Sequence, residues 1–339
     1  MRTLVLAPNW VGDALMAEPV LRALAASGRE LVVVGKRGLA PLLELLPGVV
    51  EIVERAGDDG ETVDRLRSAG CDEAVVLPNS FRSAWWVARA GIERRFGYRG
   101  DGRGLLLDPA IARPRGRRRQ IEDYAELLAA MGVAPPGSWV PRLALPDELR
   151  ERGRERLARG HIDLAAGPVV GLFPGAEWGP SKRWPWRRFA ELAVELRRRH
   201  PGAQPVIVAG PKELWLSVRV HEESGKLHPV VGPDLDLAGL AGVVAHFDLL
   251  VTNDSGPMHL AAALGVPTVA LFGPTDPRRT APAGEGHRVL ARDLWCSPCF
   301  RRHCPLLHHR CLRGISVDQV ATAALERLAA RSAASGERD

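Results

Sequence analysis

The sequence has no long hydrophobic run and very few lysines. The first absence excludes a class of protein, and the second makes each lysine informative. No apolar run reaches the roughly 20 residues that a membrane-spanning helix needs. The apolar run at the N-terminus is also too short for a signal peptide, so we expect a cytoplasmic protein. Only Lys36, Lys182, Lys212 and Lys226 are lysines, within a total of 46 lysines and arginines. Because arginine is the default cation, each lysine suggests a site that requires a compact ammonium.

The sequence also lacks the motifs of several common ligand-binding classes. The glycine-rich fingerprint G-x-G-x-x-G of dinucleotide-binding loops is absent. No RNA-binding signature and no interleaved aromatic series is present, so we expect no nucleic acid partner. The composition, with 46% hydrophobic and 25% charged residues, is typical of a well-packed protein. A chain of 339 residues has room for two domains.

Short apolar runs alternate with helical stretches in two similar halves of the chain. Strands are expected near residues 2–7, 31–35, 49–53, 73–77, 168–173, 205–209, 247–252 and 268–272. A proline-rich stretch over residues 133–146 separates the halves. The pattern predicts an α/β protein with two Rossmann-like, doubly wound parallel sheets, in domains at 1–145 and 146–332.

The stretch Val251–Pro277 has the pattern of a strand, a tight turn, a helix and a second strand. Its two polar clusters, Asn253–His259 and Gly273–Asp276, fall at the carboxyl ends of strands, where ligands of parallel sheets bind. The turn offers backbone N–H groups and the positive end of a helix dipole to an anion. Alternatively, Asp254 or Ser255 only caps the helix.

Three charged residues follow other strands of the two halves. Asp13 lies in the loop after the first strand and is either a helix N-cap or a general base. Lys182 lies in the first strand-end loop of the second half, where it either neutralises a departing phosphate or is a solvated loop lysine. Glu213 follows the next strand and either accepts hydrogen bonds from a ribose or is an ordinary glutamate of a first helical turn.

The segment Arg94–Arg119 is strongly basic, with nine arginines against two aspartates, a net charge of +7. Glycine and proline are frequent, so we expect it to be mostly loop. It is either a solvated arginine-rich surface or a patch for phosphates, sugar acids or the membrane surface. The candidate acceptor and anion-binding residues are Asn9, Arg94, Arg95, Arg99, Arg117, Arg118 and Arg119.

Four of the five cysteines fall in residues 295–314, which we call the cysteine loop. Cys296, Cys299, Cys304 and Cys311 have the spacing C-x2-C-x4-C-x6-C. Cytosolic thiols stay reduced, so disulfides are not expected. The spacing suits a structural, non-catalytic zinc site; the alternative is a reduced loop packed at the edge of a cleft.

Four ordered stretches carry a resemblance that covers nearly the whole chain. They are NWVGDALMAEPVLRAL, PGAEWGPSKRWPWRRFAELA, NDSGPMHLAAALGVPTVALFGPTDP and CSPCFRRHCPLLHHRCL. Together they resemble glycosyltransferase family 9, the bacterial heptosyltransferases of the lipopolysaccharide core, and within it the heptosyltransferase II group. The resemblance implies a GT-B fold, with the acceptor on the N-terminal domain, the nucleotide-sugar on the C-terminal domain and a cleft between them.

The resemblance also implies roles for individual residues. Asp13 matches the family's general base, and Lys182 matches the lysine on the donor diphosphate. The donor-binding residues implied are Gly175, Ala176, Lys182, Glu213, Asp254, Ser255, Gly256 and His259. Of these, Gly175 and Ala176 replace hydroxyl residues of other members and offer only backbone amides.

The implied reaction is an inverting transfer of heptose from ADP-heptose to the lipid A-linked inner core, with no metal or other cofactor in catalysis. The implied location is the cytoplasm, peripheral to the anionic inner leaflet of the inner membrane. The alternatives are heptosyltransferase I, a glycosyltransferase of the same fold with another nucleotide-sugar, or a non-catalytic protein that binds nucleotides or polyanions.

Overall fold

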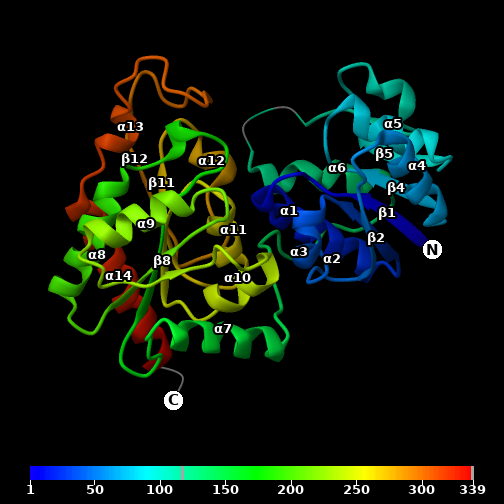
Figure 1. Ribbon diagram of the computed structural model, residues 1–339. Coiled ribbons are helices and arrows are strands. Elements are labelled where there is room, and N and C mark those ends of the chain that lie inside the picture. Colours follow the sequence, from blue (N-terminus) through cyan, green and yellow to red (C-terminus); the bar gives the residue numbers. More distant parts are fainter. Residues whose placement is uncertain (115, 117, 337–339) are drawn as a thin grey trace. The chain divides into compact units, whose positions relative to one another are not determined.

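The computed structural model describes residues 1–114, 116 and 118–336, and it forms two compact units. Unit 1 is Met1–Ala144 and unit 2 is Leu145–Asp339. Each unit is built around a six-stranded sheet whose neighbouring strands are parallel, with helices packed on it (Figure 1). This confirms the predicted class, an α/β protein with two doubly wound sheets.

Unit 1 has the strand order β3-β2-β1-β4-β5-β6. Its strands are β1 (Arg2–Leu6), β2 (Glu30–Gly35), β3 (Val49–Glu54), β4 (Glu73–Val76), β5 (Arg94–Tyr98) and β6 (Ala110–Ile111). Its helices are α1 (Val11–Met16), α2 (Glu18–Ala26), α3 (Ala40–Leu43), α4 (Asp59–Ser68), α5 (Phe81–Arg89) and α6 (Ala125–Ala130). Single 3-10 turns are η1 (Arg37–Leu39), η2 (Arg103–Leu106) and η3 (Gln120–Tyr124).

The core of unit 1 follows from its central strand. The last three residues of β1, Leu4–Leu6, are apolar and buried on both faces, as expected for the middle of a parallel sheet. Leu4 and Leu6 point to the face covered by α4 and α5, where they join Leu66 and Val87 in one hydrophobic cluster. Helices α2 and α6 pack on each other and on strands β2 and β5. The carboxyl end of β1 therefore leads into α1 from a rigid strand.

Unit 2 has the strand order β12-β11-β10-β7-β8-β9. Its strands are β7 (Val169–Phe173), β8 (Gln204–Val208), β9 (Val230–Val231), β10 (Leu249–Asn253), β11 (Thr268–Phe272) and β12 (Arg288–Ala291). Its helices are α7 (Asp147–Arg159), α8 (Trp186–Arg199), α9 (Leu214–Glu223), α10 (Leu237–Val244), α11 (Gly256–Ala263), α12 (Pro277–Thr280), α13 (Arg310–Arg313) and α14 (Val317–Gly336), with the 3-10 turn η4 (Pro180–Lys182).

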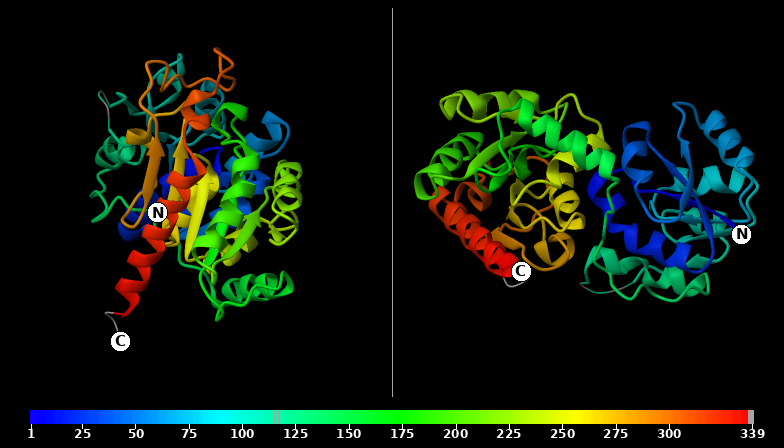
Figure 2. Two further views of the ribbon diagram at one scale, coloured as in Figure 1. Left: turned by 90° about the vertical axis from the view of Figure 1, so that its left-hand side faces the viewer. Right: turned by 90° about the horizontal axis from the view of Figure 1, so that it is seen from below.

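Two helical layers cover the sheet of unit 2 (Figure 2). Helices α8, α9 and α14 lie on one face, where Phe189 and Val320 pack against residues of β7, β10 and β11. On the other face, Met258 of α11 packs against Phe272 of β11. The predicted strand-turn-helix-strand unit is thus confirmed as β10, α11 and β11, with both strands buried.

The structure differs from the sequence-based expectations in two places. The single helical stretch expected after the first strand is divided into α1 and α2 near Ala17, because Pro19 has no N–H with which to continue the ladder. The basic segment, expected to be mostly loop, opens with strand β5, in which Phe96 and Tyr98 are buried. Among the described helices, none has both the length and the apolar character to cross a bilayer.

Candidate functional site

An ion pair lies at the carboxyl edge of the sheet in unit 2. The ammonium of Lys182, on η4, is 2.6 Å from the carboxylate oxygen Oδ2 of Asp254, directly after β10. Thr275, after β11, donates its hydroxyl to the same oxygen at 2.6 Å. The side chains of Lys182 and Asp254 are only 14% and 5% exposed. The fold therefore brings one lysine, one carboxylate and one hydroxyl together from three neighbouring strand ends.

Asn253 fixes the loop that carries this lysine. Its Oδ1 accepts the backbone N–H of Trp184 at 2.9 Å, and its Nδ2 donates to the carbonyls of Pro174 and Gly175 at 3.0 and 3.1 Å. The side chain of Asn253 is fully buried, so these bonds form away from water. In the sequence, a polar residue at the end of an apolar strand marked Asn253 as a candidate, but this pattern did not predict its hydrogen-bond partners.

The alternative that Asp254 or Ser255 only caps α11 is wrong. Ser255 is the N-cap residue, yet it makes no side-chain capping hydrogen bond. Its hydroxyl instead lies 3.2 Å from the hydroxyl of Thr252. Asp254 directs its carboxylate to Lys182 and Thr275. His259 is buried on the same helix, one turn after its start.

Glu213 is buried and clamps the loop between β7 and η4. Its Oε1 accepts the backbone N–H of Ala176 at 2.9 Å and the guanidinium of Arg183 at 2.7 Å. A Cβ at Gly175 would lie 2.2 Å from Oε2 of Glu213, so a larger residue there would displace the carboxylate from this position. In this structure the amide of Ala176 thus faces Glu213, and contacts of these residues with a phosphate or a ribose stay predictions.

In unit 1, Asp13 has a hydrogen-bond partner that is distant in the sequence. Asp13 lies in the first turn of α1, whose N-cap residue is Trp10, so the N-cap alternative for Asp13 is wrong. Gln120, at the start of η3, donates its Nε2 to Oδ1 of Asp13 at 2.8 Å. Burial raises the pKa of Tyr124 at the end of η3, and the Asp13 carboxylate raises it further, so Tyr124 stays neutral. No pattern in the sequence pointed to Gln120.

Much of the basic segment serves the fold of unit 1. Arg95 donates its guanidinium to three backbone carbonyls, and Arg103 is fully buried and donates to the carbonyl of Tyr98. Arg94 pairs with Glu73 at 3.4 Å. Arginine forks that hold loop carbonyls rigidify the segment and leave fewer charges for a ligand.

The remaining candidate anion-binding residues differ in exposure. Arg118 pairs with Glu126 at 2.6 Å, which raises the pKa of the guanidinium. Arg99 and Asn9 are exposed, and Arg119 is half-buried. Arg117 lies outside the described residues. The proposed role of these residues in binding an acceptor stays a prediction.

The zinc site predicted in the cysteine loop is not supported. Within the described part of the chain, no group of three or more His, Cys, Asp or Glu side chains is placed to hold a metal ion. The four thiols line a cavity of only about 20 Å³ together with His308, whose Nε2 is 4.0 Å from Sγ of Cys296. In the metal-free loop, burial raises the pKa of the Cys311 thiol, so this thiol stays protonated at neutral pH.

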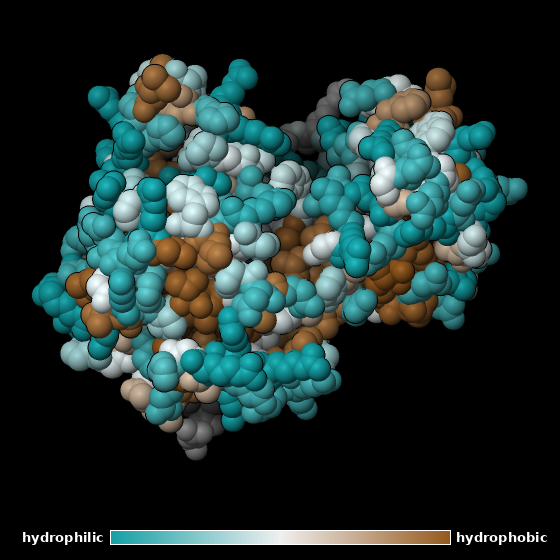
Figure 3. Space-filling view, in the orientation of Figure 1, coloured by the Kyte–Doolittle hydropathy of each residue, from teal (hydrophilic) through white to brown (hydrophobic). Residues whose placement is uncertain are grey.

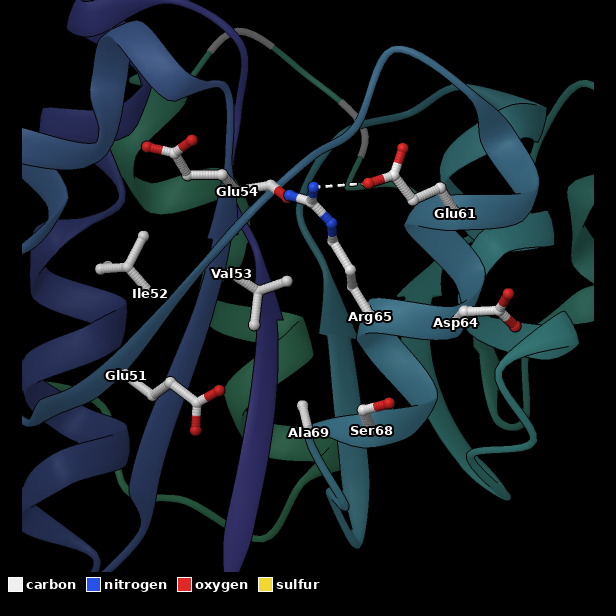
Figure 4. A pocket seen from close by; sticks show the side chains of 9 residues that line it. All are labelled: Glu51, Ile52, Val53, Glu54, Glu61, Asp64, Arg65, Ser68 and Ala69. Atoms are coloured by element: carbon white, nitrogen blue, oxygen red, sulfur yellow. Dashed lines mark hydrogen bonds and ion pairs between the residues drawn. The ribbon is translucent and has the colours of Figure 1, made fainter.

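A larger hollow, of about 460 Å³, lies in unit 1 between β3 and α4 (Figure 4). Glu51, Glu54, Glu61 and Asp64 line it, and the one cation among its lining residues, Arg65, pairs with Glu61 at 2.6 Å. This excess of carboxylates repels phosphates, so the hollow is unsuited to an anionic ligand. None of the candidate site residues lines it.

The comparison with protein families decides the class of the protein. Residues 61–309 match the model of glycosyltransferase family 9 (heptosyltransferase). The chain belongs to glycosyltransferase family 9. The matched region includes Lys182, Glu213 and Asp254 but begins after Asp13.

Individual family 9 proteins resemble this chain over most of its length. Lipopolysaccharide heptosyltransferase 2 of Escherichia coli is 33% identical over 309 residues, which cover 86% of this chain and 88% of that protein. Lipopolysaccharide heptosyltransferase 1 of Pseudomonas aeruginosa is 27% identical over 334 residues, covering 90% and 87%. The solved structure of E. coli ADP-heptose lipopolysaccharide heptosyltransferase II has a TM-score of 0.82 at 29% identity, covering 98% of this chain and 100% of that one. This similarity confirms the predicted GT-B fold class.

Proposed function

We propose that this family 9 member is a type II lipopolysaccharide heptosyltransferase that moves heptose from ADP-heptose to the inner core. The observation that carries the proposal is the largely buried ammonium of Lys182, held 2.6 Å from Asp254 at the start of α11. A fixed positive charge beside a helix N-terminus suits a nucleoside diphosphate. The similarity to the solved structure of E. coli ADP-heptose lipopolysaccharide heptosyltransferase II supports ADP-heptose as the donor.

In the proposed donor site, unit 2 binds the nucleotide-sugar. Lys182 and the backbone N–H groups at Ser255 and Gly256 contact the diphosphate, and His259 contacts the donor one turn further along α11. Asp254 and Thr275 hold the lysine in place before the donor binds. Such preorganised charge offsets the negative charge that grows on the departing ADP, without reorganisation during the reaction.

In the proposed reaction, Asp13 of unit 1 is the general base. An acceptor hydroxyl oxygen attacks the anomeric carbon of the heptose while the bond from that carbon to the diphosphate oxygen breaks. The hydroxyl proton passes to Asp13, ADP departs, and the anomeric configuration inverts. Gln120 supports this role because the hydrogen bond that its Nε2 donates to Oδ1 of Asp13, at 2.8 Å, orients the carboxylate. Lys182 and α11 supply the positive charge, so the transfer proceeds without a metal ion.

The proposed acceptor is a lipid A-linked inner core, bound by unit 1 at the inner leaflet of the inner membrane. Arg99 and Asn9 are its most exposed candidate contacts. The phosphates and acidic sugars of such an acceptor are complementary to arginine forks. Heptosyltransferase I remains the second candidate, because the P. aeruginosa relative also matches 90% of this chain.

Donor specificity is tested by thermal unfolding with a panel of nucleotide-sugars. A ligand that binds only the native state raises the unfolding midpoint, so ADP-heptose is expected to protect and donors with other bases or sugars are not. Transfer is then measured on purified acceptors that end in one inner-core heptose or in none. Type II activity requires the heptose-bearing acceptor, whereas activity only on the heptose-free acceptor identifies type I.

The stereochemistry and the metal requirement have separate tests. NMR of the product is expected to show an anomeric configuration opposite to that of the donor; retention would contradict a single displacement. Transfer is expected to continue in excess EDTA, and loss of activity that Mg²⁺ restores would contradict the metal-free reaction.

A further inference from the structure

The cysteine loop presents hydrophobic side chains to solvent. Trp295 and Leu307 are 89% and 81% exposed, and Phe300 and Leu306 are 54% and 44% exposed. Figure 3 shows hydrophobic residues gathered at the upper tip of unit 2, where Figure 1 places the chain between β12 and α13. Such a group of large exposed side chains is costly in water and usually marks an interaction surface.

The loop is also positively charged, and its charges are not neutralised. It holds Arg301, Arg302, Arg310 and Arg313 and has no aspartate or glutamate. Within the described residues, none of these four guanidinium groups takes part in an ion pair or a hydrogen bond. Burial lowers the pKa of His309, so the arginines rather than this histidine carry the charge at neutral pH.

The backbone of the loop is fixed while its side chains point outward. The carbonyls of Arg301 and Arg302 accept the hydroxyl and the N–H of Ser181 at 2.5 and 3.2 Å. Phe300 donates its N–H to the carbonyl of Pro274 at 2.8 Å. Phe300 and Leu307 have positive φ values of 51° and 56°, a conformation that bulky residues rarely adopt. A strained, anchored loop that still exposes its largest apolar side chains suggests a functional constraint.

We propose that the cysteine loop is a membrane-docking surface that inserts Trp295 and Leu307 among the lipids of an anionic bilayer. Aromatic and aliphatic side chains with flanking arginines are the combination that binds at the boundary between headgroups and acyl chains. The free arginines are complementary to the negative surface of such a bilayer, which distinguishes this occupant from a neutral apolar partner. The inference rests on the proposed function, in which the acceptor is anchored in a membrane.

This surface differs from the one that the sequence suggested. In the basic segment, Arg95 and Arg103 hold backbone carbonyls, Arg94 and Arg118 pair with glutamates, and Phe96 is buried. In the cysteine loop the arginines are unpaired and apolar side chains lie beside them. Membrane binding needs both features in one exposed place. The cysteine loop has four exposed large apolar side chains beside its unpaired arginines, whereas among the described residues of the basic segment only Leu105 is a large apolar side chain that is exposed.

The test is co-sedimentation with vesicles that contain neither donor nor acceptor. The full chain is mixed with vesicles of phosphatidylglycerol and phosphatidylcholine or of phosphatidylcholine alone. We expect binding to the anionic vesicles. The variant R301Q/R302Q should bind about 25-fold more weakly, about fivefold for each arginine. The variant W295S/L307S should bind at least about tenfold more weakly, because less apolar surface leaves water.

Matched controls lie elsewhere in unit 2. The variant W215S removes another half-exposed tryptophan, and R152Q/R154Q removes the same charge from the exposed face of α7. Both should bind like the wild type, and all variants should keep the unfolding midpoint of the wild type. The proposal would be overturned if the wild type and both loop variants bound anionic vesicles equally. It would also be overturned if the wild type did not co-sediment with anionic vesicles.

A second copy of the chain is the rival occupant of the surface. If the loop instead mediates self-association, the wild type will sediment as a dimer without vesicles and W295S/L307S as a monomer, and the membrane proposal fails. Because the vesicles hold no substrate, this result is independent of the transfer assay. Docking can therefore fail while heptosyl transfer is confirmed, or the reverse.

Discussion

The two units share one strand order but place opposite charges at equivalent strand ends. Counted from the first strand of each unit, both sheets have the order third, second, first, fourth, fifth, sixth. After the first strand, unit 1 carries the carboxylate of Asp13 and unit 2 carries the ammonium of Lys182. Each charge is held by a residue from a later loop, Gln120 for Asp13 and Asp254 for Lys182. The same scaffold thus presents a carboxylate in one unit and an ammonium in the other, because the loops differ.

The units also differ in their response to acid. All ten histidines lie between His161 and His309, so unit 1 has none. His228 of unit 2 is fully buried, and burial lowers its pKa to about 4. Substitutions in each unit can therefore test the comparison. Asp13 is replaced in unit 1, and Lys182 and His228 are replaced in unit 2.

The largest expected effect is that of Asp13→Asn. Loss of the proposed general base should lower kcat by about 10²–10⁴-fold and leave the KM for donor nearly unchanged, because in the proposed mechanism unit 2 binds the donor. Steady-state transfer kinetics measure both values. Asp64→Asn, which changes an exposed aspartate of the same unit, should have no effect on either. Near-normal turnover of Asp13→Asn would remove that residue from catalysis.

Lys182→Ala should impair both donor binding and rate. Removing a fixed charge from the departing diphosphate typically costs about 10²–10³-fold in kcat, and the KM for donor should rise as well. The matched control is Lys226→Ala, an exposed lysine of the same unit. Unchanged kinetics for Lys182→Ala would exclude contact with the phosphates.

Gln120 and Thr275, which each hold a charged residue in place, should affect different kinetic constants when they are replaced. Gln120→Ala removes a hydrogen bond to a carboxylate and should lower kcat about tenfold, with little change in KM. Thr275→Val removes the hydroxyl that holds Asp254 and should mainly raise the KM for donor. In the Asp13→Asn background, Gln120→Ala should cost nothing further, since the two residues act together. Additive losses would mean that Gln120 acts elsewhere.

The smallest expected effect is on stability. Because the folded pKa of His228 is about 4 and the ordinary value is 6.5, the unfolded chain binds the proton more readily. The neutral histidine therefore favours folding above about pH 6.5, and that stability is lost as the pH falls towards 4, by up to about 3 kcal/mol. His228→Leu should flatten this loss in urea unfolding curves at pH 7 and 5, and His161→Asn, at an exposed site, should not. If His228→Leu lost as much stability as the wild type between pH 7 and pH 5, His228 would not be the source of that loss.

Local sequence signals predicted the helices and strands that are flanked by proline or glycine. Helix α7 runs over Asp147–Arg159, between Pro146 and Gly160, and β11 follows Pro267. Strand β5 escaped prediction because its first two residues are arginines within a glycine-rich basic segment. Its strand conformation depends on parallel pairing with β4, which no local pattern reports.

The sequence by itself determined which strand ends carry these charged side chains, since Asp13, Lys182 and Asp254 each follow an apolar run that was predicted as a buried strand. The tertiary structure alone decided their partners. Gln120 and Asp13 are 107 residues apart, and their hydrogen bond exists because the last elements of unit 1 return to its first strand. It also decided that the arginines of the cysteine loop are unpaired, while backbone carbonyls or glutamates hold Arg94, Arg95, Arg103 and Arg118 of the basic segment. Pairing depends on which groups the fold brings within about 3 Å, and that is a property of packing rather than of spacing along the chain.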